Sequence, residues 1–200
     1  MAPDPALSER IYQELRRRLL AGGFKLRERL DVARIASEMQ ASATPVREAL
    51  ARLAAERLIK ARPARGFFAV LWTEAELKAL YEWRGALVQM AADARKEFEP
   101  RMLAAGDYGD VVRTLFASIE SEANHELRHA AANADDRLHA ARRVELEIVP
   151  GAPADAQAIA ASGSKRALIA ALRRYHAKRL VNVAAIRERA LLQALPPNGE

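Results

Sequence analysis

Nine consecutive residues, Ser42 to Leu50, constrain the fold of this chain more than any others. They read Ser-Ala-Thr-Pro-Val-Arg-Glu-Ala-Leu, with threonine and proline just before a run of helical spacing. Threonine caps helix N-termini well, and proline suits the first helical position because its missing N–H would have no partner there. We therefore expect a helix that is capped at Thr44 and begins at Pro45.

The predicted helix has one apolar face and one polar face. Apolar residues recur at helical spacing along it: Val46, Leu50 and Leu53. They should pack against a short preceding helix over residues 32–39. This leaves Thr44, Arg47 and Glu48 pointing outward, with Ala51 and Arg52 on the flank. A guanidinium group there suits a two-pronged contact with guanine or with a phosphate. The alternative is an ordinary amphipathic core helix with a solvated arginine.

A short basic hairpin follows the helix. Residues 59–62 and 67–70 have the composition of two strands, and Pro63-Ala64-Arg65-Gly66 supplies the turn between them. Arg62 and Arg65 should lie near its tip. Helix, turn, helix and hairpin in this order predict a winged helix-turn-helix that binds double-stranded DNA.

Charge is concentrated in the same part of the chain. Residues 1–72 hold 14 Lys and Arg against 8 Asp and Glu, whereas residues 73–200 hold 18 of each. The whole excess of +6 therefore lies in the predicted DNA-binding region. The predicted DNA contacts are Arg34, Thr44, Arg47, Arg52, Arg62, Arg65 and Gly66.

Composition limits the remaining classes of protein. The chain has no cysteine, which excludes disulfides and thiolate sites and is compatible with a reducing cytoplasm. No apolar run approaches the roughly 18–20 residues of a membrane span, and no signal peptide is recognisable. We therefore expect a cytoplasmic protein with no membrane segment.

The second part of the chain is alanine-rich and helical in its periodicity. The spacing predicts helices over about 73–97, 109–132, 134–144 and 164–195, with an ambiguous segment at 144–149. The predicted fold is mostly α, with a winged helix-turn-helix domain over residues 1–72 and an all-helical bundle over 73–200.

Residues 7–90 resemble the GntR family of bacterial transcription regulators. The resemblance rests on Leu7–Tyr12, on Thr44–Leu50 with Arg52-Leu53 after it, on Glu56–Ile59 and on Arg65-Gly66. Three positions depart from the family pattern. Ala43 replaces an arginine, Leu26-Arg27 replaces a Pro-Gly turn, and Arg57 replaces a glycine. The missing arginine implies an unusual operator or weaker affinity.

The helical part resembles the FadR-type, FCD-like effector domain. Leu80–Arg84 is similar to that domain's first helix, Asp135–His139 to its Asp-x3-His pair, and the segment around His176 to its last helix. The resemblance implies a divalent metal, Zn, Ni or Mn, held by Asp135, His139 and His176. It also implies a small carboxylate effector bound by Arg84.

Alternatives remain for these residues. The family's fourth metal ligand is absent, because no histidine lies between residues 140 and 175. His125 and His129 form a rival pair four residues apart, and all four histidines are compatible with packed or solvated helical positions. Arg84 is equally compatible with an ordinary ion pair.

The resemblance implies a transcription regulator, a repressor by expectation, that binds a pseudo-palindromic operator as a homodimer and responds to an organic acid. The alternative is an effector-independent or architectural DNA-binding protein with a degenerate ligand domain. A metal-dependent enzyme is disfavoured, since the sequence contains no recognisable catalytic motif.

Overall fold

The chain folds into two compact units, an N-terminal one that runs to Leu71 and a helical one over Trp72–Leu192. The computed structural model describes residues 5–70, 72–97, 99 and 106–193. Each unit is considered by itself. None of the described helices is both long enough and apolar enough to cross a bilayer.

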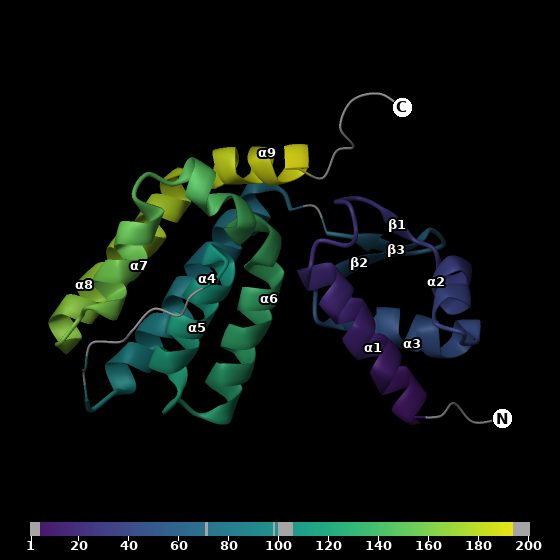
Figure 1. Ribbon diagram of the computed structural model, residues 1–200, viewed down its shortest axis with the longest axis horizontal. Helices are drawn as coiled ribbons and strands as arrows, with labels where there is room; N and C mark the ends of the chain where they lie inside the picture. Colours follow the sequence, from purple (N-terminus) through teal and green to yellow (C-terminus); the bar gives the residue numbers. More distant parts are fainter. Residues whose placement is uncertain (1–4, 71, 98, 100–105, 194–200) are drawn as a thin grey trace. The chain divides into compact units, whose positions relative to one another are not determined.

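The N-terminal unit contains three helices and a small sheet (Figure 1). Its elements are α1 (Pro5–Leu20), β1 (Arg29–Leu30), α2 (Val32–Glu38), α3 (Ala43–Ala55), β2 (Ile59–Arg62) and β3 (Gly66–Ala69). The apolar faces of the helices meet in one core with residues such as Leu15, Ile35, Leu50 and Leu53, all of them fully buried. The predicted winged helix-turn-helix is confirmed.

The sheet has three antiparallel strands in the order β1-β3-β2. The hairpin of β2 and β3 was predicted, and Arg62 pairs with Gly66 at its tip. The strand β1 was not predicted, because two residues are too short to show an alternating pattern. Arg29 of β1 pairs with Phe68, which places an additional arginine beside the hairpin.

Helix α3 begins two residues earlier than predicted. Ser42 is the N-cap residue and Ala43 the first helical one, so Thr44 and Pro45 are the second and third residues of the helix rather than its cap and start. Proline is tolerated there because the N–H groups of the first turn have no intrahelical acceptor. The shift keeps Thr44 exposed at the N-terminal end of the helix.

The same helix ends in a Schellman motif. The N–H of Leu58 donates to the carbonyl of Leu53 at 3.0 Å and that of Arg57 to the carbonyl of Ala54 at 3.0 Å. The motif requires a left-handed residue, and Arg57 has a φ of 59°. This explains the departure noted in the sequence, since Arg57 occupies a position where glycine is preferred. Arg27, with a φ of 68°, repeats the situation in the earlier turn.

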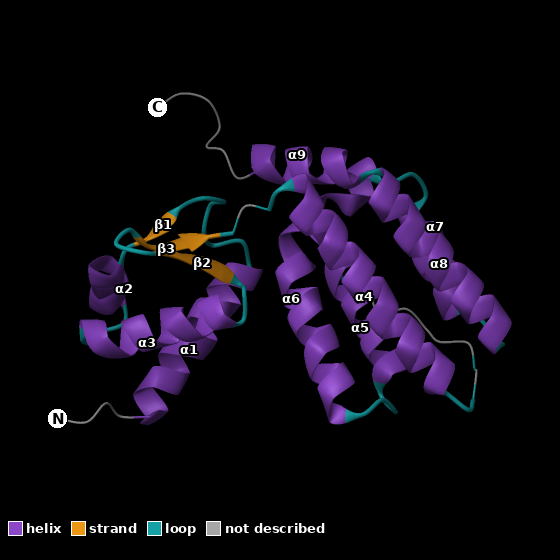
Figure 2. Ribbon diagram, turned by 180° about the vertical axis from the view of Figure 1, so that it is seen from behind, coloured by secondary structure: helices purple, strands orange, loops and turns teal. Residues whose placement is uncertain are grey.

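The helical unit contains six helices among its described residues (Figure 2). They are α4 (Glu74–Ala94), α5 (Tyr108–Glu120), α6 (His125–Ile148), α7 (Ala152–Ala160), α8 (Lys165–Val181) and α9 (Val183–Gln193). A complete capping box of Thr73 and Glu76 starts α4. Helix α4 packs against α5, α6 and α8 and so forms the centre of the bundle.

Several predicted helix boundaries in this unit were wrong. Asn124 caps α6 by accepting the N–H of Leu127, so the run predicted over 109–132 breaks there and α6 continues to Ile148. The ambiguous segment 144–149 is therefore mostly helical. Helix α7 was missed because Gly151 and Pro153 suggest a break, although proline suits a first helical turn. Asn182 divides the predicted helix 164–195, whose last two residues lie outside the described part.

The strain at Arg57 gives a prediction about stability. A left-handed conformation costs an L-residue about 1–2 kcal/mol. Glycine avoids this cost in the folded protein, but it also makes the unfolded chain more flexible, which offsets part of the gain in stability. We expect R57G to raise the free energy of unfolding, measured by urea titration, by about 0.5–1 kcal/mol. R57A should leave it nearly unchanged, and A51G in the middle of α3 should lower it by about 1 kcal/mol. A lower stability of R57G than of R57A would contradict this explanation.

Candidate nucleic-acid interface and the interior of the helical unit

Three polar contacts fasten α3 to α1. The hydroxyl of Ser8 donates to Glu48 at 2.8 Å, and Arg52 pairs with Glu9 at 2.6 Å. The hydroxyl of Tyr12 donates to Glu56 at 2.8 Å. The three partners, Glu48 and Arg52 on α3 and Glu56 at its C-cap, are four residues apart, so they form one stripe that faces α1.

The outward face of α3 lies beside this stripe. Thr44 and Arg47 are exposed, whereas Val46 and Leu50 are fully buried against the core. No residue in the described part of the chain forms an ion pair or hydrogen bond with the guanidinium group of Arg47. The side chain is therefore available to a partner outside the unit, as a base or phosphate contact requires.

Two other predicted DNA contacts are already engaged within the unit. Arg34 pairs with Glu28 at 3.1 Å and with Glu38 at 3.2 Å. Arg52 pairs with Glu9, and its guanidinium carbon lies 3.7 Å from the centre of the Tyr12 ring. These contacts give both arginines a role in joining helices, and binding a phosphate would compete with it.

The hairpin collects arginines without carboxylate partners. Arg62 and Arg65 are exposed near its tip, and Arg62 lies 4.9 Å from the centre of the Phe68 ring. Gly66 has a φ of 89°, which side chains rarely adopt, so the turn explains its glycine. Arg29, which the sequence analysis missed, is exposed on β1 beside Gly66. Within the described residues neither Arg62 nor Arg65 has an acidic partner, whereas the charge of Arg29 acts on the nearby carboxylate of Asp31.

The comparison with protein families matches this unit. Residues 7–69 fit the family model described as bacterial regulatory proteins of the gntR family. The N-terminal unit is a GntR-family helix-turn-helix domain. The match covers α1 to β3, and so includes the outward face of α3 and the basic hairpin.

Solved structures extend the likeness in fold to the helical unit. A GntR protein from Rhodococcus sp. RHA1 is 17% identical, with a TM-score of 0.61 over 94% of this chain and 99% of its own. McbR/YncC from E. coli is 19% identical, with a TM-score of 0.53 over 97% of this chain and 98% of its own. No curated protein sequence is similar enough to count as a relative.

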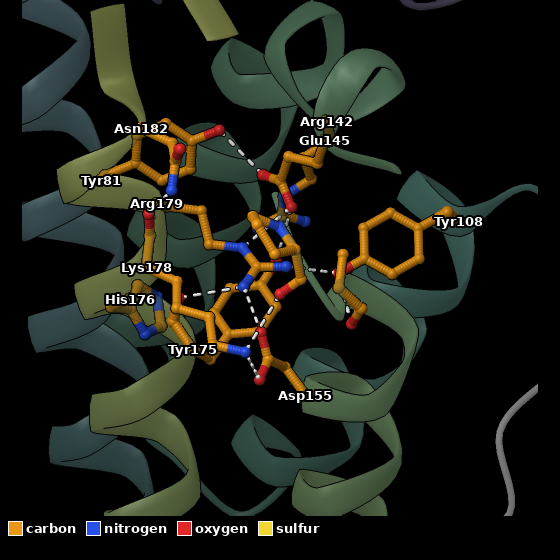
Figure 3. Close-up of polar contacts among 12 residues, drawn as sticks. Tyr81, Tyr108, Arg142, Glu145, Asp155, Tyr175, His176, Lys178, Arg179 and Asn182 are labelled. Atoms are coloured by element: carbon orange, nitrogen blue, oxygen red, sulfur yellow. Dashed lines mark hydrogen bonds and ion pairs between the residues drawn. The ribbon is translucent and has the colours of Figure 1, made fainter. Parts of the chain in front are cut away.

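A buried arginine in the helical unit joins four other helices (Figure 3). Arg179 of α8 is fully buried and donates to Glu145 of α6 at 3.0 Å and to Asp155 of α7 at 3.0 Å. It also donates to the hydroxyl of Tyr108 of α5 at 2.5 Å. Glu145 in turn accepts the hydroxyl of Tyr81 of α4 at 2.8 Å. Every helix from α4 to α8 thus contributes a side chain to one network.

A second buried network surrounds Arg84, the predicted effector-binding residue. Its guanidinium group donates to Asp135 at 2.7 and 3.0 Å and to Glu120 at 2.5 Å. Arg142 pairs with the same Asp135 at 2.6 Å. Burial alone would raise the pKa of Asp135, but the guanidinium groups of Arg142 and Arg84 hold it below its usual value. The charge of Arg84 is therefore already matched inside the bundle.

The three predicted metal ligands do not gather around one point. Asp135 is held by two arginines, and the Nδ1 atoms of His139 and His176 each meet a backbone carbonyl, of Asp136 and Leu172 respectively. In the described part of the chain no three His, Asp or Glu side chains are arranged to hold a metal ion. The residues present do not fit a shared metal, because Asp135 would first have to lose both ion pairs.

Two buried side chains keep polar atoms without a partner. The Nε and Nη1 atoms of Arg142 and the Nε2 atom of His176 make no hydrogen bond within the described structure. Both side chains lie by Phe116, with the Arg142 guanidinium carbon 5.5 Å and the His176 ring centre 5.7 Å from the centre of its ring. Buried groups of this kind normally have partners, so these atoms are where water or a ligand would bind.

The buried imidazole of His176 predicts a pH dependence of stability. Burial, with the nearby charges of Arg84 and Arg142 adding to it, lowers the pKa of His176 to about 3. The unfolded chain takes up this proton near pH 6.5 and the native protein does not, so the free energy of unfolding is lost as the pH falls from 6.5 towards 3. The expected loss is about 1.4 kcal/mol per pH unit.

Urea unfolding between pH 6.5 and 5 measures this loss. H176L should remove its component from the pH dependence, whatever the variant's overall stability. The other three histidines are present in both proteins, so the difference between them isolates His176. Identical pH dependence of the two proteins would show that the native imidazole accepts a proton in this range.

Proposed function

We propose that the protein is a DNA-binding transcription regulator, acting as a repressor, that recognises a pseudo-palindromic operator as a homodimer. The observation that carries the proposal is Arg47, exposed on the outward face of α3 and unpaired within the described structure of a GntR-family domain. An arginine without acidic partners has all its donors available to DNA, and no carboxylate offsets its charge.

The surrounding side chains suggest a division of labour. Arg47, with Thr44 at the start of α3, reads base edges in the major groove. Arg62, Arg65 and the newly identified Arg29 neutralise phosphates beside it. The absence of an arginine at Ala43 leaves Arg47 as the main base-reading cation of this helix. One such helix contacts only a few base pairs, and this favours a two-fold dimer with half-sites about one helical turn apart.

A small carboxylate effector is the second part of the proposal. It is supported by the unpaired Nε and Nη1 atoms of Arg142, which are donors inside the bundle that a carboxylate could accept, while Nε2 of His176 is an acceptor suited to a hydroxyl group of the effector. Arg84, the residue predicted for this role, is satisfied by Glu120 and Asp135 and would support Arg142 through Asp135. The alternative is an effector-independent regulator. It is favoured by the same ion pairs, because the buried arginines and carboxylates already neutralise one another, and water would then bind the unpaired atoms of Arg142.

The recognition helix is tested by R47A in gel shifts on the protein's own promoter region. We expect a loss of about 1–3 kcal/mol of discrimination between operator and random DNA, because the two-pronged base contact disappears. The matched control is R113A, which removes an arginine from α5 of the helical unit. R47A with undiminished sequence preference would sink the assignment of α3.

The hairpin should behave differently in the same assay. R62A/R65A should weaken binding to all sequences alike and flatten the salt dependence, with a change of about 0.9 in slope for each phosphate that is no longer neutralised. A selective loss of operator binding in this variant would instead assign the hairpin a base-reading role.

Thermal unfolding with a panel of mono- and dicarboxylates separates the two forms of the proposal. An effector present at 100 times its Kd should stabilise the fold by about 2.7 kcal/mol, read as a rise in Tm. R142M should abolish the rise, because it removes the unpaired donors while keeping most of the side chain's volume. No response to any carboxylate, with DNA binding intact, would favour the effector-independent regulator.

A further inference from the structure

Helix α4 carries an apolar stripe on the face that points away from the bundle. Trp83 is 48% exposed and Met90 57% exposed, and the exposed Ala79 and Ala86 lie on the same side of the helix. The four residues follow one another at intervals of four, three and four, which keeps them in a single row. Exposed apolar side chains that form one continuous row, unlike single scattered ones, mark an interaction surface.

The order of sizes along the stripe identifies its partner. The stripe alternates small and large: Ala79, Trp83, Ala86 and Met90. If a second α4 lies antiparallel across it, with a two-fold axis between Arg84 and Gly85, Trp83 meets Ala86 of the second copy and Met90 meets Ala79. Each large side chain then faces a small one, and the same contacts occur twice.

Charge at the edge of the stripe agrees with this register. Helix α8 runs antiparallel beside α4, with Lys165 against Asp93 at 3.1 Å and Arg173 against Gln89 at 3.4 Å. Glu82 lies on the α8 side of the stripe and has no ion-pair partner among the described residues. The two-fold brings it level with Arg173 and Arg174 of the second copy, both exposed.

We infer that the α4 stripe of Ala79, Trp83, Ala86 and Met90 is the surface through which two copies of this chain associate, antiparallel and two-fold symmetric. The inference rests on the proposed homodimer and adds the residues and the register that build it. Since the stripe belongs to the helical unit alone, association does not require DNA.

Cross-linking tests the register, and the absence of cysteine from the chain makes the result easy to interpret. In A79C/M90C the two-fold places each new cysteine beside one of the other copy, so mild oxidation of the full chain should give a covalent dimer. A79C alone should not cross-link, because two copies of position 79 lie 11 residues, or about 16 Å, apart along the pair of helices. Equal cross-linking of A79C, or none in A79C/M90C, would overturn the register.

Sedimentation equilibrium without DNA tests the surface itself. We expect the unmodified protein to be dimeric and W83Q/M90Q to dimerise at least about tenfold more weakly, each tenfold being 1.4 kcal/mol. The matched control is L146Q/V181Q, which removes two exposed apolar side chains, 51% and 84% exposed, that lie outside the stripe. A monomeric unmodified protein, or a W83Q/M90Q variant that dimerises as tightly as the control, would overturn the inference.

The same measurements separate this inference from the proposed function. R47A should remain dimeric while losing operator preference. If no DNA preference is found but W83Q/M90Q still dissociates, the surface stands and the DNA function falls. If operator binding is found with a dimer that W83Q/M90Q leaves intact, the function stands and the surface is elsewhere.

Discussion

The helical unit depends on the buried hydrogen bonds and ion pairs that the guanidinium group of Arg179 makes. It is fully buried and holds Glu145, Asp155 and Tyr108, which come from three other helices, while Glu145 brings in Tyr81 from a fourth. Removing one member of such a buried ion pair costs about 3–5 kcal/mol, because the remaining charge stays away from water. The interior of the bundle contains many alanines beside large apolar side chains, and apolar packing has no preferred direction. The network adds directional bonds that fix how the helices meet.

In the N-terminal unit, polar contacts that fix how helices meet lie at the surface. Its helices share a continuous apolar core, and the contacts of Ser8, Glu9 and Tyr12 with α3 set the position of that helix along α1. Arginines therefore fall into two kinds. Those engaged by carboxylates, such as Arg34 and Arg52, hold helices together. Those left unpaired, Arg47 above all, carry the charge that DNA would meet.

Sequence alone predicted the first unit well because each of its parts leaves a local signal. The helix start near Pro45, the apolar spacing to Leu53 and the glycine of the hairpin all act within a few residues. It could not predict which arginines are engaged, because the partners of Arg52 and Arg84 lie about forty residues away or more. The same limit applies to the predicted metal site: the Asp135–His139 spacing is local, whereas the competition of Arg84 and Arg142 for Asp135 is visible only in three dimensions.

The contacts between α1 and α3 also bear on how operator specificity can change. On α3, the row of Glu48, Arg52 and Glu56 is tied to α1, and the neighbouring row of Thr44, Arg47 and Ala51 is not. Replacing the whole of α3 with the helix of another regulator would therefore exchange the residues that contact α1 together with those that face outward. Exchanging only Thr44, Arg47 and Ala51 would leave the contacts between α3 and α1 unchanged. The residues that hold α3 on α1 are therefore different from those that face outward, so the outward-facing residues can change, in evolution or by engineering, without disturbing how the helix is attached.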